Sequence, residues 1–170
     1  MNLFVDAFRD MTFIEREPAK KDTLNLSDTR PFVWSKLVYL ADRCILNYVP
    51  CDNDFEVDFA KFLDTAEDVT AFSKIVSKIG FFMEYRDSQG NLRMYYPDFV
   101  AVTDSEHLII ETKGMVDVDV KYKDKRAKQW CEDATNLTGQ KWLFYRVNLE
   151  EFRRHKFRSI KELVSTFRIE

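Results

Sequence analysis

The 170-residue sequence contains few of the residues that build common nucleotide and metal sites. Only four glycines occur, and none opens a GxxxxGK[ST] or GxGxxG pattern. Because those patterns supply the backbone that cradles phosphates, a nucleotide-binding loop of either kind is excluded. Only two histidines are present, at positions 107 and 155, which argues against a histidine-rich zinc site.

Cysteines and long apolar runs are also scarce. The three cysteines are odd in number and form no CxxC pair, so we expect reduced thiols rather than a disulfide framework. No apolar run approaches the roughly 20 residues that a bilayer requires. The N-terminal stretch MNLFVDAFRDMTF has acids among its first ten residues and no apolar segment of a secretory signal. The sequence therefore predicts a cytoplasmic location without membrane association.

Charge is plentiful but unevenly distributed. The formal net charge is −3, yet residues 51–68 are strongly acidic while 113–128 and 141–161 are mainly basic. The basic stretches could follow a phosphate backbone, and the acidic stretch could dock a basic partner. Runs of this kind are also typical of solvated helix faces, and the composition alone leaves these alternatives open.

The hydrophobic periodicity predicts alternating helices and strands. Apolar residues at helical spacing follow Asn53 or Asp54, and a second helix is expected over 69–79, ending at Gly80. Strands are expected at 81–86, 92–103, 106–113 and 141–148, with a hairpin turn at Gly90, and further helices at 121–136 and 150–167. This order predicts an α/β fold on a mixed sheet. Residues 16–31 look like a loop, and 31–50 could pack on the edge of the core.

The stretch YYPDFVAVTDSEHLIIETKG, residues 95–114, places charges on two apolar strands. Asp98 directly follows Pro97, and the next strand ends in Glu111-Thr112-Lys113. If the strands pair about a turn at 103–106, Asp98 lies beside the Glu111 and Lys113 end of its neighbour, since alternate residues share a face. Proline cannot donate to a sheet ladder, so Pro97 marks an edge or distortion that re-aims the next side chain.

Two neighbouring carboxylates repel each other unless a cation lies between them. Mg²⁺ suits this position because it binds oxygen ligands from one or two carboxylates and retains waters. Lys113, on the face of Glu111, would place a positive charge near a phosphate or an attacking water. The alternative is a solvated strand face on which Glu111 and Lys113 form an ordinary salt bridge.

Flanking helices carry further candidates. Glu56 lies at the margin of the apolar face of the first helix, where it could reach the metal or its waters, or serve as a first-turn acid favoured by the helix dipole. Lys121, Lys125 and Gln129 follow the charged strand and are possible DNA contacts. An exposed helix surface is the more common explanation for residues in such a pattern.

This motif resembles the P-D-(gap)-(D/E)-x-K signature of the restriction-endonuclease-like nuclease superfamily, with Pro97-Asp98 and Glu111-Thr112-Lys113 filling every position. The segments VPCDNDFEVDFAKFLDTAEDVTAFSK before it and KDKRAKQWC and GQKWLFYRVN behind it are similar to the C-terminal endonuclease domain of type III restriction subunits. The similarity covers roughly residues 45–148. It divides the chain into an extension over 1–50, a nuclease core over 51–149 and a helical tail over 150–170.

The resemblance implies an αβββαβ core with a mixed central sheet flanked by helices. It implies metal ligands at Asp98, Glu111 and the carbonyl of Thr112, with Lys113 and Glu56 as further catalytic residues. It also implies Mg²⁺-dependent hydrolysis of DNA, with Mn²⁺ able to substitute. Partners in that family are a helicase-like ATPase motor, which precedes the nuclease domain on the same polypeptide, and a methyltransferase subunit, and a homodimer would cut both strands.

We therefore expect a metal-dependent DNA endonuclease, either an excised domain or a small independent relative. Rival interpretations are a nucleic-acid-binding module of the same fold that no longer cuts, and a protein-interaction domain. A nuclease acting on RNA or on branched DNA also fits the motif. Sequence recognition is not expected here, because backbone contacts position a protein without reading bases.

Overall fold

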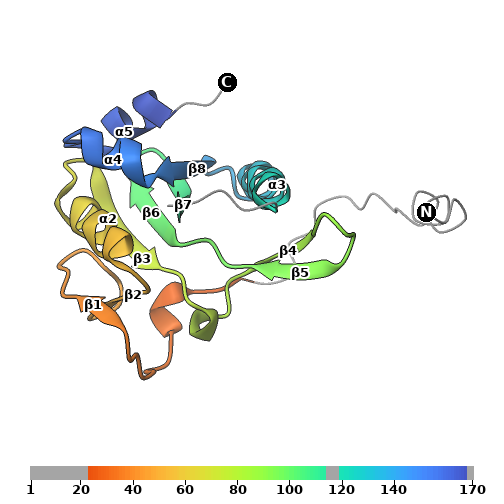
Figure 1. The fold of residues 1–170 in the computed structure, drawn as a ribbon, viewed down its shortest axis with the longest axis horizontal. Helices are drawn as coiled ribbons and strands as arrows, with labels where there is room; N and C mark the ends of the chain where they lie inside the picture. The colour runs from red at the N-terminus through yellow and green to blue at the C-terminus, as the bar shows by residue number, and fades with distance from the viewer. Residues whose placement is uncertain (1–22, 114–118, 168–170) are drawn as a thin grey trace, which may run out of the picture.

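The computed structural model describes residues 23–113 and 119–167 and is built around one mixed sheet (Figure 1). Its strand order is β3–β6–β7–β8, in which β3 pairs antiparallel with β6, β6 antiparallel with β7, and β7 parallel with β8. The strands are β3 (Val69–Lys74), β6 (Phe99–Thr103), β7 (His107–Lys113) and β8 (Trp142–Asn148). The parallel pair is joined through a helix, as a crossover requires.

Helices cover both faces of this sheet. On one face lie α2 (Asp54–Thr65), α4 (Leu149–Arg154) and α5 (Ile160–Phe167), and on the other lies α3 (Val120–Thr138) (Figure 1). Alternate residues of a strand point to opposite faces of the sheet. Ile110 therefore packs in the hydrophobic core between the sheet and α2, and Ile109 packs in the core between the sheet and α3. The order α2–β3–β6–β7–α3–β8 confirms the predicted αβββαβ core.

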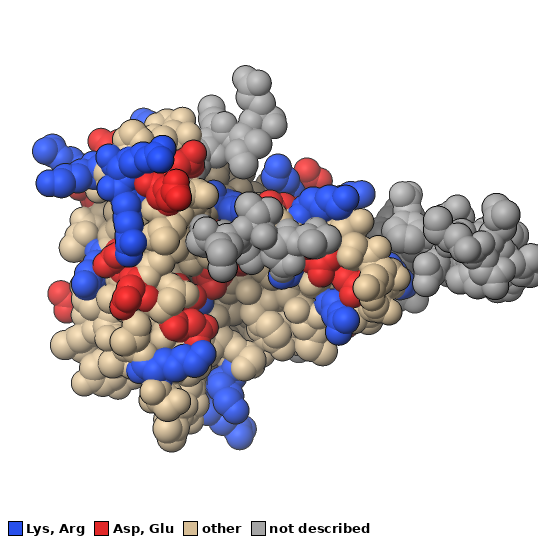
Figure 2. Space-filling view, in the orientation of Figure 1, with Lys and Arg blue, Asp and Glu red and all other residues tan. Residues whose placement is uncertain are grey.

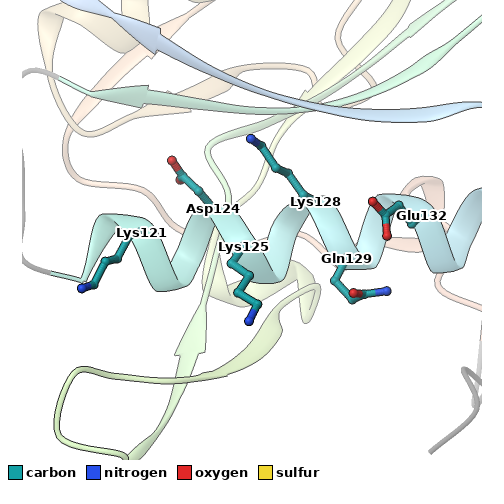
Figure 3. A pocket seen from close by; sticks show the side chains of 6 residues that line it. All are labelled: Lys121, Asp124, Lys125, Lys128, Gln129 and Glu132. Carbon is teal, nitrogen blue, oxygen red and sulfur yellow. The ribbon is translucent and has the colours of Figure 1, made fainter. Parts of the chain in front are cut away.

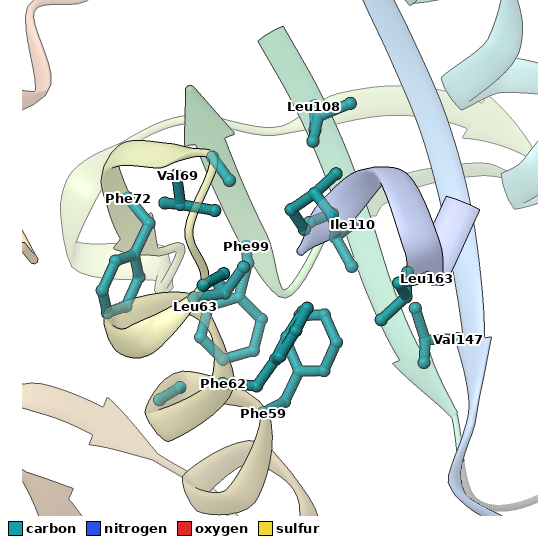
Figure 4. Close-up of a cluster of buried hydrophobic side chains, with 14 of the residues drawn as sticks. Phe59, Phe62, Leu63, Val69, Phe72, Phe99, Leu108, Ile110, Val147 and Leu163 are labelled. Carbon is teal, nitrogen blue, oxygen red and sulfur yellow. The ribbon is translucent and has the colours of Figure 1, made fainter. Parts of the chain in front are cut away.

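The first core helix forms where its sequence signals predicted it. The Asn53 side chain accepts a hydrogen bond from the Glu56 amide at 3.0 Å, which caps the N-terminus of α2. One face of α2 is buried, and Phe59 lies at its centre with its ring centroid 5.5 Å from that of Phe99 in β6 (Figure 4). This packing fixes the N-terminal turn of α2, and Glu56 with it, against the sheet.

The predicted second helix over 69–79 is wrong. Val69–Lys74 forms strand β3, paired with β6 through Phe72↔Ala101 and Lys74↔Phe99, and only Ser77–Ile79 forms a short 3-10 turn, η2, that ends at Gly80 with φ 82°. Phe72, Ser73 and Lys74 are buried in succession, so β3 is covered on both faces and shows no two-residue alternation. Its apolar spacing matched a helix, and strand pairing overrode it.

The predicted strand over 92–103 is interrupted. Leu92–Tyr95 (β5) pairs with Met83–Arg86 (β4) in a separate hairpin, turned at Gly90, and β6 begins only at Phe99. The hairpin extends away from the central sheet (Figure 1), and Arg126 of α3 donates to the Glu84 carbonyl at 3.0 Å. Pro97 lies at the break, as its missing N–H predicts.

The segment before α2 packs on the edge of the core, as predicted for 31–50. Its elements are η1 (Leu26–Asp28), β1 (Leu37–Tyr39) and β2 (Val49–Cys51), and the Phe72 amide of β3 donates to the Arg43 carbonyl at 3.1 Å. All three cysteines are free thiols. No helix within residues 23–113 and 119–167 is long and apolar enough to cross a bilayer. The boundaries at residues 50 and 149 stay predictions.

Candidate active site

Asp98 and Glu111 come from adjacent ends of two central strands. The β6–β7 register includes Phe99↔Ile110, so Asp98 and Glu111 follow one step beyond that pair. Oδ2 of Asp98 accepts two hydrogen bonds from Thr112, at 2.7 Å from its amide and 2.7 Å from its hydroxyl. The polar end of β7 thus holds the Asp98 carboxylate in place at the break that Pro97 introduces.

The other oxygen of Asp98 contacts a lysine that the sequence motif does not contain. Nζ of Lys74, in β3, lies 2.8 Å from Oδ1 of Asp98 and 3.2 Å from Oε2 of Glu56. The Lys74 side chain is 3% exposed, and its ammonium lies 5.2 Å from the Phe99 ring centroid. Lys74 therefore joins the acid of α2 to the acid of β6.

Glu56 points into the protein rather than to solvent. Its side chain is 6% exposed, Oε2 accepts from the Asp52 amide at 2.8 Å, and Oε1 accepts from the Asn53 side chain at 3.2 Å. Burial raises the pKa of Glu56, and the charge of Lys74 partly offsets that rise. Glu56 lies in the first turn of α2, and its carboxylate is buried and paired with Lys74.

Glu111 has its own set of partners on the α3 side of the sheet. The buried hydroxyl of Tyr95, at the end of β5, donates to Oε2 at 2.8 Å, and Nη1 of Arg146 in β8 lies 3.7 Å from Oε1. Arg146 also pairs with Asp124 of α3. Burial and the negative charge of Glu111 raise the pKa of Tyr95, so the phenol remains a proton donor.

The remaining predicted residues lie at and beyond the end of β7. Lys113 is the last residue of β7 and pairs in register with Asn148, while its side chain lies outside the described residues. Lys121, Lys125 and Gln129 lie along one side of α3 and line a hollow of about 430 Å³ together with Asp124, Lys128 and Glu132 (Figure 3). Since Asp124 also holds Arg146, this hollow adjoins the side chains around Glu111.

Acidic and basic side chains alternate over the face shown in Figure 2, in keeping with the small net charge. Attraction of a polyanion would therefore depend on local groups such as the lysines of α3 rather than on the field of the whole molecule.

The acids at the strand ends suit a hard divalent cation. Across residues 23–113 and 119–167, no three His, Cys, Asp or Glu side chains gather closely enough to hold a metal by themselves. Asp98 and Glu111 nevertheless supply oxygen donors at neighbouring positions, and Mg²⁺ binds through one or two carboxylates while keeping several waters. The donor set fits that cation, with Glu56 engaged by Lys74 instead.

Replacing Tyr95 with phenylalanine is expected to lower the free energy of unfolding by about 1.5–3 kcal/mol, because Glu111 loses a buried hydrogen-bond donor. Urea denaturation at neutral pH measures this change. Tyr96→Phe is the matched control, since the Tyr96 hydroxyl makes a weak, exposed hydrogen bond to the Met94 sulfur at 3.5 Å. Equal effects of the two substitutions would show that the Tyr95 hydroxyl does not support Glu111.

Comparison with known proteins identifies a family. The model of the family described as archaeal Holliday junction resolvase (Hjc) matches residues 74–170, more than half of the chain, and this region includes Lys74, Asp98 and Glu111. No curated protein and no solved structure matches the chain. The match does not show the predicted relation to type III restriction subunits. The chain belongs to the archaeal Holliday junction resolvase (Hjc) family, which is part of the PD-(D/E)xK nuclease superfamily.

Proposed function

We propose that this protein is a metal-dependent endonuclease that cleaves branched DNA, with the four-way junction as its substrate. The observation that carries the proposal is the position of Asp98 and Glu111 at neighbouring ends of β6 and β7, within the region that the resolvase family matches. The family name supports the four-way junction as the substrate, and Asp98 and Glu111 support metal-dependent hydrolysis.

The side chains of this protein would hold and orient the reacting groups. Asp98 and Glu111 are the proposed ligands, together with the carbonyl of Thr112; the Thr112 amide and hydroxyl orient Asp98, and Tyr95 orients Glu111. Bound Mg²⁺, or Mn²⁺ in its place, would polarise the scissile phosphate and lower the pKa of a coordinated water. Lys113 would stabilise negative charge that builds on the phosphate.

The family match favours a junction over a restriction site. The expected type III relation, with its ATPase motor and methyltransferase subunit, gains no support from that match, and neither does a role in restriction-modification. A homodimer is part of the proposal, because resolving a four-way junction requires two nicks and one chain contributes one candidate site. The cytoplasmic location stays a prediction.

The lysines of α3 are the proposed phosphate contacts. Lys125→Ala is expected to reduce the slope of log K against log salt concentration for junction binding by about 0.9, the loss of one phosphate contact. Fluorescence anisotropy in several salt concentrations measures the slope. Lys141→Ala is the control and should leave the slope unchanged. Lys141 directly precedes the first residue of β8 and pairs with Glu106. An unchanged slope in both variants would remove α3 from the interface.

The decisive experiment compares cleavage of a labelled four-way junction, a linear duplex of the same sequence and a single strand, each with Mg²⁺, Mn²⁺ or a chelator. We expect paired nicks in the junction only, and only with metal. Junction binding without cutting under every metal condition would favour the inactive DNA-binding module. Absence of both binding and cutting would favour the protein-interaction domain, and equal cutting of the duplex would contradict junction specificity.

A further inference from the structure

Lys74 is a buried cation that the proposed chemistry does not yet use. We propose that its ammonium acts as the built-in counter-ion of Glu56 and of Oδ1 of Asp98, so that the site takes a single divalent cation, at Asp98 and Glu111. Glu56 is then a positioning residue that acts through Lys74 rather than a metal ligand. This inference rests on the proposed nuclease function.

The burial and charge of Lys74 support this role. Lysine is almost never fully buried unless it is paired, and here both ion-pair partners are acids of the candidate site. The ammonium lies 2.8 Å from Oδ1 of Asp98 and 3.2 Å from Oε2 of Glu56, and its single positive charge neutralises one of the two carboxylates beside it.

The hydrogen bonds divide the acid oxygens between two functions. Both oxygens of Glu56 are engaged, Oε2 by Lys74 and the Asp52 amide and Oε1 by Asn53. Asp98 gives Oδ1 to Lys74 and turns Oδ2 towards Thr112 and the end of β7, which also carries Glu111. A second cation, bound by Glu56 and Oδ1 of Asp98, would have to displace the ammonium that both oxygens already contact.

The test is calorimetric titration of Mn²⁺ into the full chain, with unfolding curves recorded on the same samples. The native protein is expected to bind one Mn²⁺ per chain. Lys74→Met is expected to bind a second Mn²⁺, because Glu56 and Oδ1 of Asp98 are released from the ammonium. Glu56→Gln is expected to retain one Mn²⁺, with an affinity within about threefold of native, since Glu56 is not a ligand.

Should Lys74→Met not fold, the double variant Lys74→Met/Glu56→Gln takes its place, because it leaves no charge at the buried position of Glu56 and only the less buried Asp98 loses its ion-pair partner. It is expected to bind one Mn²⁺ about tenfold more tightly than the native protein, since the neighbouring ammonium is gone. Native affinity in the double variant, one ion in a folded Lys74→Met, or loss of binding in Glu56→Gln would each overturn the inference while the nuclease proposal stands. No binding by the native protein would overturn both.

Discussion

Replacing Asp98 with asparagine is expected to slow junction cleavage by more than about a hundredfold, since loss of a mere supporting contact to a metal ligand already costs about 10–100-fold. The substitution preserves shape but removes the charge that Lys74 and a divalent cation would share. The asparagine oxygen can still accept from Thr112, yet its amide group would then face the Lys74 ammonium. Single-turnover cleavage of a four-way junction measures the rate.

The control for this substitution is Asp104→Asn. Asp104 lies exposed in the turn between β6 and β7, at the opposite end of the strand pair, and its loss should leave the cleavage rate within about twofold of native. Unfolding curves of both variants separate a loss of chemistry from a loss of fold. An Asp98→Asn protein that is folded and cuts at the native rate would remove Asp98 from the site.

Replacing Lys74 with methionine is expected to lower the free energy of unfolding by about 3–5 kcal/mol, the range for breaking a buried ion pair by removing one partner. The reason is that the buried carboxylate of Glu56 and that of Asp98 would both lose the cation that neutralises them. Urea denaturation at pH 7 measures the change. Methionine matches the lysine side chain as far as Cε but lacks Nζ, so the substitution keeps the apolar stem and removes both ion pairs together with the ammonium contact to the Phe99 ring.

A double-mutant cycle that combines Lys74→Met with Glu56→Gln measures the interaction energy between Lys74 and Glu56. The combined variant should lose less stability than the sum of the single variants, because the interaction between Lys74 and Glu56 is then lost once rather than counted twice. Lys36→Met is the control: Lys36 pairs with Asp52, but the two side chains are 58% and 42% exposed, so its loss should cost less than about 1 kcal/mol. Additive effects in the cycle would contradict direct coupling between Lys74 and Glu56.

Much of the fold was predictable where local signals agree. The cap at Asn53, the end of α3 at Gly139 and the hairpin turn at Gly90 each match a backbone conformation that the residue type favours. β3 was not predictable in the same way. Its apolar residues fit helical spacing as well as strand spacing, and only pairing with β6 decided between them.

The candidate site was likewise predictable only in part. Asp98 and Glu111 could be predicted as neighbours because a short turn joins their strands, so pairing places one acid beside the other. Lys74 was missed because it belongs to no motif and its segment was interpreted as helix. Its one visible signal is a lysine within the apolar run AFSKIV, where a charge requires a buried partner.

The order of residues by itself determined the caps, the turns and the pair of acids on consecutive strands, since these depend on contacts between residues close in the chain. Only the tertiary structure decided which strands build the sheet and that Lys74 contacts both Glu56 and Asp98, the latter 24 residues after Lys74. Contacts over such separations leave no local periodicity, because they arise when α2 and β6 pack against β3, and the free energy of burying those surfaces sets them.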